Sequence, residues 1–470
     1  MPSTPPDTAA LGPRVFIVGG GFAGLEAAKA LAKTNCRVTL VDRRNHHVFQ
    51  PLLYQVATAS LSPAEIAAPI RHILRKQRNC RVVLAEMVGV DVARKHLLFR
   101  GGAVEYDYLI LAAGATHSYF GRDDFAALAP GLKSIEDATE MRKRILLAFE
   151  SAEYEGSEAR RRAALTFAIV GGGPTGVELA GAIKEIAAKS IPADFRQIDT
   201  TTTRVILLQG GDRLLPQMPP ELSEHAKRDL EAMGVEVRLN ARVTDVTKDG
   251  VKIGEEFVPV RNVFWAAGVQ GNPIGRTLGV PLDRSGRVQV GSDCSIPGHP
   301  EVFVVGDLAA MLSADTQQPV PGVAQGAIQM GRYVGRLIAG EIAGSSTPTD
   351  RKPFSYYDKG ILATIGRNRA VGVLFKNRQV TGFIAWLLWG LIHIAFLIGF
   401  RNRLAVMTNW VWNWLLNARD ARLITGDARI DVAEPRPGEV ILANEGQASG
   451  TLTPPSQPAA ASSGSSSVTA

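Results

Sequence analysis

Short apolar stretches alternate with helix-like segments along the first two thirds of the chain. Residues 14–18 (RVFIV) have the pattern of a buried strand, a glycine-rich turn then opens a helix, and residues 36–42 (CRVTLVD) form the next strand. The same order returns at 165–170 (LTFAIV), at a second glycine-rich helix start, and at 203–209 (TRVILLQ). Strands that alternate with helices predict parallel sheets, so the pattern indicates two βαβ units.

Three more apolar strands end in small residues, at 106–115, 262–269 and 301–309. Their positions between and after the two units predict that the second domain is inserted into the first. The expected fold class is α/β, with two nested Rossmann-type dinucleotide-binding domains (glutathione-reductase-like) plus C-terminal membrane-associating helices. The expected boundaries are 14–160 with 290–345 for the first domain, 161–289 for the second, and 346–425 for a membrane-anchoring region, between disordered ends at 1–13 and 442–470.

Composition excludes several classes of protein. With 46% hydrophobic and 21% charged residues in 470, the chain is neither disordered nor fibrous. Cys36, Cys80 and Cys294 lack paired spacing, so neither a disulfide framework nor a metal site is expected. The net charge of +7 comes without a nucleic-acid-binding motif, and nucleic acid is not an expected partner. Residues 1–14 lack the pattern of a secretory signal or transit peptide, which predicts that the protein stays in the compartment where it is made.

The first glycine-rich turn has the spacing GxGxxG, with Gly19, Gly21 and Gly24 placed between a strand and a helix. Glycine permits the tight turn and lets the amides of the helix N-terminus approach a pyrophosphate. Asp42 ends the following strand, where a carboxylate accepts hydrogen bonds from ribose hydroxyls. The motif predicts a bound dinucleotide.

The second glycine-rich turn repeats this spacing, with Pro174 and Thr175 inside a motif formed by Gly171, Gly173 and Gly176. Two such sites in one chain predict a flavin, FAD, held without a covalent link, and a nicotinamide dinucleotide. Gln209 stands where an acid is expected at the end of the second strand. Its amide binds a 2′-hydroxyl and does not repel a 2′-phosphate, so NADPH is an open alternative beside NADH.

Other strand ends add candidate cofactor contacts. Ala113-Gly114 and Ala267-Gly268 allow backbone to pass close to a cofactor, although both are also ordinary turn sequences. Asp307 follows a strand, where an acid can bind the ribityl chain of a flavin; helix capping is the alternative, and the two roles can coexist.

The C-terminal region predicts membrane attachment. Between Arg378 and Arg401 lie 22 residues without a formal charge, and residues 404–416 form an amphipathic helical pattern. Five of the six tryptophans fall in these two segments, with arginines beside them, which is typical of the headgroup boundary. A monotopic helical pair in one leaflet is favoured, with a single transmembrane span and a soluble dimer interface as alternatives.

At this point the residues resemble a family, the two-dinucleotide flavoproteins, and within it the type II NADH:quinone oxidoreductases. The resemblance covers about residues 14–425 and is most specific at 46–63 (HHVFQPLLYQVATASLSP), 323–331 (VAQGAIQMG) and 386–403 (WLLWGLIHIAFLIGFRNR). Gln209 departs from the family, whose members more often carry an acid there. The chain also lacks the reactive cysteine pairs that related disulfide reductases and sulfide:quinone oxidoreductases need.

The resemblance implies roles for individual residues. Glu178 would lie near the nicotinamide and the quinone, and Gln325 and Gln329 would line the quinone pocket, although their i, i+4 spacing also suits a helix surface. The implied FAD contacts are Gly19, Gly21, Phe22, Ala23, Gly24, Asp42, Arg43, His47, Ala113, Asp307 and Ala327.

The expected activity is oxidation of NADH at the membrane without proton pumping, by hydride transfer to FAD and two-electron reduction of ubiquinone or menaquinone. The expected location is the cytoplasmic face of the cell membrane, and the expected assembly is a homodimer. Two alternatives stay open: a soluble FAD-dependent reductase of an electron-carrier protein such as ferredoxin, and a redox-sensing protein that binds its nucleotides for signalling.

Overall fold

The structure is a computed structural model that describes residues 12–375, 377–416, 419 and 421–426. The tail expected at 442–470, and residues 1–11 of the expected N-terminal segment, lie outside the described residues.

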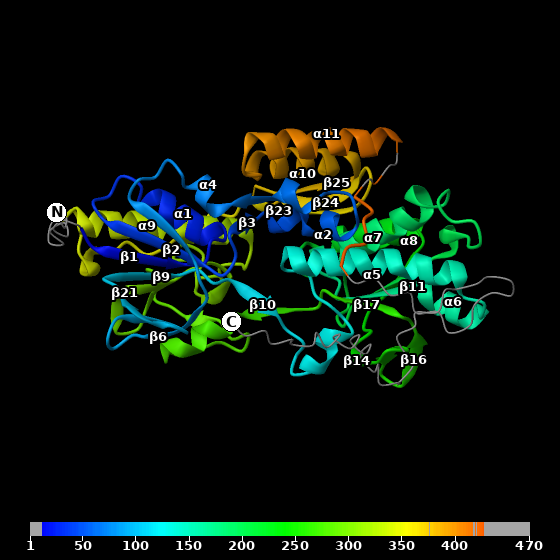
Figure 1. Ribbon diagram of the computed structural model, residues 1–470, viewed down its shortest axis with the longest axis horizontal. Helices are drawn as coiled ribbons and strands as arrows, with labels where there is room; N and C mark the ends of the chain where they lie inside the picture. The colour runs from blue at the N-terminus through cyan, green and yellow to red at the C-terminus, as the bar shows by residue number, and fades with distance from the viewer. Residues whose placement is uncertain (1–11, 376, 417–418, 420, 427–470) are drawn as a thin grey trace, which may run out of the picture.

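A six-stranded sheet forms the core of the first domain, in the order β20-β21-β9-β1-β2-β5. All neighbouring pairs are parallel except β20 with β21. Helices α1 and α9 pack against each other beside this sheet (Figure 1). A Cβ on Gly331 of α9 would lie 2.0 Å from the carbonyl oxygen of Ala23, so the close crossing of the two helices requires glycine there. The elements are β1 (Arg14–Val18), α1 (Phe22–Ala30), β2 (Arg37–Asp42), β5 (Cys80–Leu84), β9 (Tyr108–Leu111), β20 (Ser295–Ile296), β21 (His299–Val304) and α9 (Ala324–Ile342).

A four-stranded parallel sheet, in the order β13-β12-β11-β17, forms the core of the second domain. After this sheet is complete, the chain returns to the first sheet, where β21 pairs with β9. The second sheet is therefore built from a segment inserted between two neighbouring strands of the first. The elements are α5 (Ile135–Tyr154), α6 (Glu158–Ala164), β11 (Thr166–Val170), α7 (Pro174–Glu185), β12 (Arg204–Leu208), α8 (Pro220–Ala232), β13 (Val235–Arg238) and β17 (Asn262–Trp265).

Small sheets and short helices complete both domains, and a two-stranded sheet of β10 and β18 joins the two connecting segments. The strands are β3 (His46–Val48), β4 (Ala67–Pro69), β6 (Met87–Asp91), β7 (His96–Phe99), β8 (Gly102–Glu105), β10 (Ala115–His117), β14 (Val243–Val246), β15 (Gly250–Ile253), β16 (Glu256–Pro259), β18 (Val269–Gly271), β19 (Val288–Gln289) and β22 (Ala309–Ala310). The short α-helices are α2 (Leu53–Ala57), α3 (Pro63–Ile66) and α4 (Ile70–Ile73).

The C-terminal region forms an antiparallel sheet of β23 (Gly360–Gly366), β24 (Arg369–Leu374) and β25 (Arg378–Thr381), followed by α10 (Gly382–Phe396) and α11 (Phe400–Leu416). Helix α10 lies over this sheet, and α11 lies beside α10 and packs on α3, at one side of the molecule (Figure 1). Helix α7 of the second domain runs close beneath it, because a Cβ on Gly181 would lie 1.6 Å from the carbonyl oxygen of Ile365.

The uncharged segment of 22 residues contains one complete helix, α10, and ends at the first residue of α11. Helix α10 ends at Phe396, and Gly399, with φ of +91°, turns the chain into α11. Among the described residues, no helix has both the length and the apolar character that crossing a bilayer requires.

Candidate active site

The first glycine motif forms an open helix N-terminus at the end of β1. Gly19 has φ of +108°, and its Cβ would lie 2.3 Å from the carbonyl oxygen of Ala112. A Cβ on Gly24 would lie 1.9 Å from the carbonyl oxygen of Gly19, whereas one on Gly21 would meet nothing within 4 Å. No side chain caps α1. The motif therefore has a closed side, packed on the sheet, and an open side, where helix amides can bind a phosphate.

The second motif has the same geometry. Gly171 has φ of +112°, and its Cβ would lie 2.5 Å from the backbone of Ala266 and Ala267. A Cβ on Gly176 would lie 1.8 Å from the carbonyl oxygen of Gly171, and one on Gly173 would meet nothing within 4 Å. Pro174 and Thr175 form the first turn of α7, where proline loses no helical hydrogen bond. Each motif thus offers one open helix N-terminus.

The two strand-end residues, Asp42 and Gln209, occupy equivalent places. Asp42 Oδ2 accepts a hydrogen bond from the amide of Gly20 at 2.6 Å, and Gln209 Oε1 accepts one from the amide of Gly172 at 2.9 Å. Because the Gln209 oxygen is used in this way, its Nε2 donor is left for a ligand. Asp42 offers an acceptor at its site, whereas Gln209 offers a donor.

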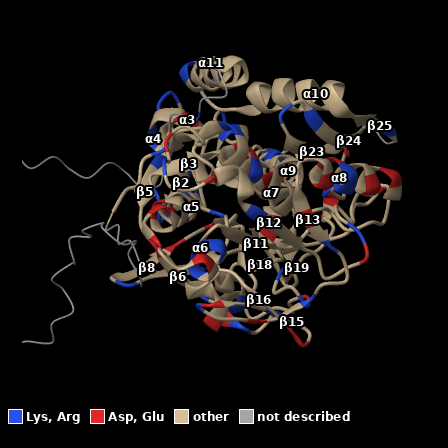
Figure 2. Cartoon of the chain, turned by 90° about the vertical axis from the view of Figure 1, so that its right-hand side faces the viewer, with Lys and Arg blue, Asp and Glu red and all other residues tan. Residues whose placement is uncertain are grey.

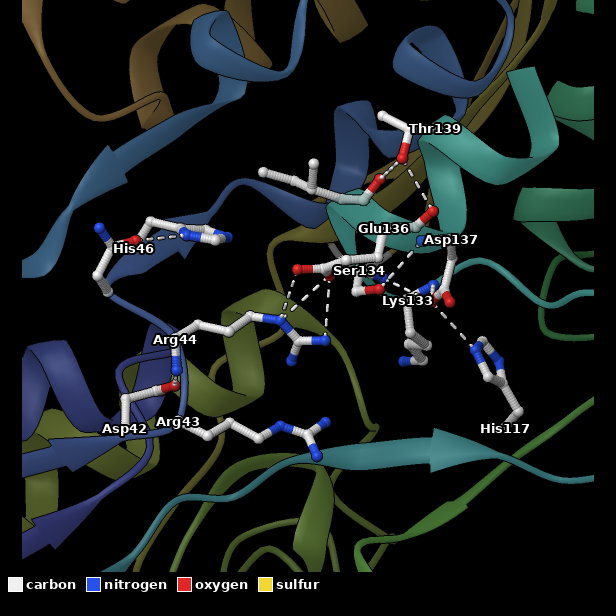
Figure 3. Close-up of polar contacts among 12 residues, drawn as sticks. Asp42, Arg43, Arg44, His46, His117, Lys133, Ser134, Glu136, Asp137 and Thr139 are labelled. Carbon is white, nitrogen blue, oxygen red and sulfur yellow. Dashed lines mark hydrogen bonds and ion pairs between the residues drawn. The ribbon is translucent and has the colours of Figure 1, made fainter. Parts of the chain in front are cut away.

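Basic side chains lie along the edge of the first motif (Figure 3). Arg44, two residues after Asp42, forms an ion pair with Glu136 in the first turn of α5 at 3.1 Å. Arg43 lies beside it and is 3.9 Å from Glu86. The Arg44 contact joins the loop after β2 to the start of α5, and the Arg43 contact joins it to the residue before β6.

Lys133 lies just before α5, and its Nζ is 3.7 Å from Asp307 Oδ2. Asp137 accepts hydrogen bonds from the amides of Lys133 and Ser134 and lies 3.2 Å from His117 Nε2 (Figure 3). The sequence analysis did not identify Lys133 or His117.

Asp307 lies inside a short 3₁₀ helix, Gly306–Leu308, whose cap is Val305, so the helix-capping alternative for Asp307 is wrong. A Cβ on Gly306 would lie 3.4 Å from the side chain of Ala327. The turn that carries Asp307 therefore meets the first turn of α9, and the structure brings these two predicted FAD contacts together.

Two buried polar atoms near these motifs lack a partner among the described residues: His47 Nε2 and Gln325 Oε1. His47 Nδ1 contacts the carbonyl oxygen of Gly20 at 3.0 Å, and the His47 ring packs against Phe22. Burial lowers the pKa of His47 to about 4, so its ring is neutral near pH 7. Buried polar atoms without partners are rare in folded proteins, and each of these fits a hydrogen bond with a bound cofactor.

A cavity of about 410 Å³ lies between α7, β23 and the two C-terminal helices. Glu178 of α7 lines it and is half-buried, and desolvation by the surrounding protein raises the pKa of its carboxyl well above the usual value. The backbone amide of Thr364 opposes this shift by a hydrogen bond. No Lys or Arg of the described chain pairs with Glu178, so the carboxyl is protonated over a wider pH range than a free glutamic acid.

Glu185 lies two turns after Glu178 on the same face of α7 and lines the same cavity. It pairs with Arg419 at 3.0 Å, and both side chains are largely buried. Arg419 also donates to the carbonyl oxygen of Thr58 at 3.0 Å. The cavity thus contains one carboxyl with a cationic partner and one without.

Hydrogen bonds connect α11 to this cavity through α2. Trp410 Nε1 donates to Gln55 Oε1 at 2.7 Å, and Gln55 Nε2 donates to the hydroxyl oxygen of Tyr54 at 3.0 Å. The Tyr54 hydroxyl is 2.9 Å from Thr364 Oγ1. Sequence analysis missed the roles of these residues, although Tyr54 and Gln55 lie within one of the stretches most specific to the family.

The two candidate glutamines of α9, Gln325 and Gln329, are not among the residues that line this cavity. Gln329 Nε2 donates to the carbonyl oxygen of Tyr357, and the Tyr357 amide donates back to Gln329 Oε1, each at 2.9 Å. These reciprocal bonds hold α9 to the start of the C-terminal region. The structure therefore does not bring the glutamines and Glu178 into one cavity, because α9 packs on α1 of the first domain.

Helix α11 is fixed to the first domain by a polar stripe. Asn402 donates to the carbonyl oxygen of Ala67 at 3.2 Å, Asn413 donates to Ser60 Oγ at 3.3 Å, and Asn409, between them, bonds to Glu65.

The outer faces of α10 and α11 are apolar. Figure 2 shows α10 free of charged residues and α11 with basic residues only near its start. Large apolar side chains are more than 45% exposed at Phe383, Ile384, Leu387, Leu391, Phe400, Leu404, Met407, Val411, Trp412, Leu415 and Leu416. Five of them, Phe383, Leu387, Leu391, Met407 and Val411, also line the cavity, which therefore opens on this apolar surface.

Comparisons with known proteins agree with this architecture. Residues 13–331 match the pyridine nucleotide-disulphide oxidoreductase family, and residues 359–420 match the NDH2 C-terminal domain. The chain is 47% identical to the type II NADH:quinone oxidoreductase Ndh of Mycobacterium tuberculosis over 425 residues, which cover 88% of this chain and 90% of that protein. This chain belongs to the type II NADH:quinone oxidoreductase family. The resemblance noted in the sequence is thereby confirmed.

Two further relatives are more distant. The internal alternative NAD(P)H-ubiquinone oxidoreductase A1 of Arabidopsis thaliana is 28% identical over 87% of this chain and 86% of its own length. The solved structure of NDH2 from Plasmodium falciparum in complex with NADH has a TM-score of 0.78 at 19% identity, and the match covers 88% of this chain and all of that one. At this identity the structural match shows the shared Rossmann-type α/β fold.

The cysteines distinguish this member from the disulphide reductases of the wider family. All three are free, and Cys36 and Cys294 are buried. Burial raises the pKa of each thiol, to about 11 for Cys36 and Cys80. A raised pKa disfavours the thiolate that attacks a disulfide.

Proposed function

We propose that this protein oxidises NADH and reduces a membrane quinone, with FAD bound non-covalently between the two substrates and without proton pumping. The observation that carries the proposal is the cavity beside Glu178. It joins a half-buried carboxyl on the helix of the second glycine motif to the exposed apolar surface of α10 and α11.

The residues around the first motif fit FAD. The open helix N-terminus at Gly21 suits the pyrophosphate, Asp42 suits the adenosine ribose, and the pair of Lys133 and Asp307 suits the ribityl chain. The unpartnered atoms of His47 and Gln325 provide two further hydrogen-bonding positions. Bound FAD supplies the group that accepts hydride from NADH and gives two electrons to the quinone.

The second motif fits NADH. Its open helix N-terminus at Gly173 binds the pyrophosphate, and α7 then leads from this turn to Glu178 within the same helix. Gln209 presents its Nε2 donor toward the ribose of the adenosine. A donor at this place also tolerates a 2′-phosphate, which supports use of NADPH beside NADH.

Reduction of a quinone consumes two protons, and Glu178 is placed to deliver one. Its raised pKa extends the pH range over which the carboxyl is protonated, and in that form it can donate to a quinone oxygen and then recover a proton from solvent. The cavity walls are aromatic and aliphatic, with Trp389 and Trp410 among them, and exclude water from the ring.

The apolar surface of α10 and α11 supports attachment to one leaflet of a membrane. The asparagine stripe of α11 bonds it to the first domain, so its exposed apolar side chains face outward into lipid. A quinone then enters the cavity directly from the bilayer. We further propose that the protein lies on the cytoplasmic face of the membrane and that it is a homodimer. Sedimentation of the detergent-solubilised protein tests the homodimer.

Rapid mixing of the purified holoprotein tests the two half-reactions separately. NADH is expected to bleach the flavin absorbance near 450 nm, and a short-chain quinone is expected to restore it. A flavin that NADH reduces but no quinone reoxidises would exclude the quinone as substrate and favour a carrier protein. Sedimentation with lipid vesicles tests the membrane part, because a soluble reductase stays in the supernatant.

A further inference from the structure

Tyr54 and Thr364 face the cavity as a pair of hydrogen-bonded hydroxyl groups. The side chains come from α2 and β23, which are 310 residues apart in sequence, and their oxygens are 2.9 Å apart. Tyr54 is 7% exposed and Thr364 is 5% exposed, and both line the cavity. Neither pair member was identified from the sequence.

The neighbouring hydrogen bonds fix how the Tyr54 oxygen is used. The indole nitrogen of Trp410 can only donate, so the side-chain oxygen of Gln55 faces it at 2.7 Å. The Gln55 nitrogen must then face Tyr54, where it donates to the hydroxyl oxygen at 3.0 Å. On the side of α11, the Tyr54 hydroxyl oxygen therefore accepts a hydrogen bond. The hydroxyl proton of Tyr54 is not used in that bond.

Counting protons shows that this pair is incomplete. The two hydroxyl groups carry two protons, and the bond between Tyr54 and Thr364 uses one of them, whichever group donates. Neither hydroxyl makes a bond to another acceptor in the described part of the chain. One proton is left in a buried place without an acceptor, and such a proton is costly unless a ligand accepts it.

The surroundings indicate which ligand fits. The backbone amide of Thr364 bonds to the Glu178 carboxyl, so the hydroxyl pair and the carboxyl are neighbours. The ring of Trp389 lies 6.4 Å from that of Tyr54 in an edge-to-face arrangement, which leaves an apolar wall beside the hydroxyls. A neutral carbonyl oxygen on a flat ring accepts one hydrogen bond here without bringing a charge into a buried site.

We propose that the Tyr54–Thr364 pair donates one hydrogen bond to a carbonyl oxygen of the quinone and holds that oxygen beside Glu178. The inference rests on the proposed quinone reduction. Because either hydroxyl can supply the free proton, the pair tolerates the loss of one hydroxyl but not of both. The two residues bind the quinone and position it.

Steady-state kinetics of Tyr54→Phe, Thr364→Val and the double variant test this redundancy. Each single variant keeps one hydroxyl proton for the quinone, so its KM for a short-chain quinone is expected to change by less than about twofold. The double variant keeps none, and its quinone KM is expected to rise on the order of tenfold. Adding back a hydroxyl as Thr364→Ser in the Tyr54→Phe background is expected to restore the low KM.

Thr166→Val is the matched control, because Thr166 is also a buried strand threonine but its hydroxyl already donates to the carbonyl oxygen of Arg162 at 2.7 Å. Reduction of the flavin by NADH is expected to be unchanged in every variant. Two results would refute the pairing. In the first, the fold-changes in KM of the two single variants multiply to the fold-change of the double variant. In the second, the double variant has an unchanged KM. A wild-type enzyme that does not reduce quinone at all would instead refute the proposed function.

Discussion

Replacing Glu178 with glutamine tests whether the carboxyl in the cavity is protonated because it is buried. Glutamine keeps the shape and the acceptor for the Thr364 amide, but it cannot ionise. In the wild type, burial raises the folded-state pKa of Glu178 above the unfolded value of 4.5. The folded protein therefore holds one more proton than the unfolded chain at pH values between the two pKa values.

The sign and the size of the effect follow from this difference. The stabilisation by Glu178 is complete below the unfolded pKa and is lost as the pH rises through the folded pKa. Between the two pKa values, ionisation of Glu178 lowers the unfolding free energy of the wild type by up to about 1.4 kcal/mol per pH unit. Glu178→Gln lacks this contribution because glutamine does not ionise. The stability of the variant relative to the wild type is therefore expected to increase with pH and then level off.

Urea unfolding of the holoprotein at a series of pH values from about 5 to about 9 measures this difference, since shifts common to both proteins cancel. Glu185→Gln is the contrasting variant, because it leaves Arg419 largely buried without its carboxylate partner and is expected to lower stability on the order of 3 kcal/mol. A difference between Glu178→Gln and wild type that stays flat across the whole pH range would refute the reasoning.

Five other variants test the cofactor sites and the apolar surface. Gln209→Glu places a carboxylate near a 2′-phosphate, and about 2 kcal/mol of repulsion is expected to lower kcat/KM for NADPH relative to NADH roughly 30-fold; an unchanged ratio contradicts the role of Gln209. Gly24→Ala is expected to destabilise the fold by about 3 kcal/mol or more, whereas Gly21→Ala is expected to fold normally but to lose FAD on gel filtration, as read from the absorbance at 450 nm. Ile384→Glu is expected to weaken vesicle binding at least about tenfold, while Val104→Glu, on the exposed strand β8, is expected to leave it unchanged.

The sequence predicted the Rossmann units well because their signals are local. The four strands expected around the two glycine motifs agree with β1, β2, β11 and β12 to within one residue at each end. Buried parallel strands are continuous apolar runs, and a glycine motif must follow them directly to reach a phosphate. Each of these features is contained in a stretch of about thirty residues.

The cavity could not be predicted in this way, because its polar contacts join distant parts of the chain. The bond between Tyr54 and Thr364 spans 310 positions, and the ion pair between Glu185 and Arg419 spans 234. Glu178 was identified through the family resemblance, and nothing in its own neighbourhood indicates burial beside β23. Gln329 was assigned to the quinone for the same reason, but a backbone segment from Tyr357 takes up its amide.

The insertion of the second domain between β9 and β21 has a consequence for synthesis on the ribosome. Strand β9, whose Leu109, Ile110 and Leu111 are fully buried in the finished protein, pairs with β21 on one side. The 187 residues from 112 to 298 must be translated before β21 emerges, which takes about 10 to 40 s at typical elongation rates. During that interval the nascent chain carries an unpaired, apolar sheet edge, so early folding intermediates of this enzyme are exposed to aggregation at β9.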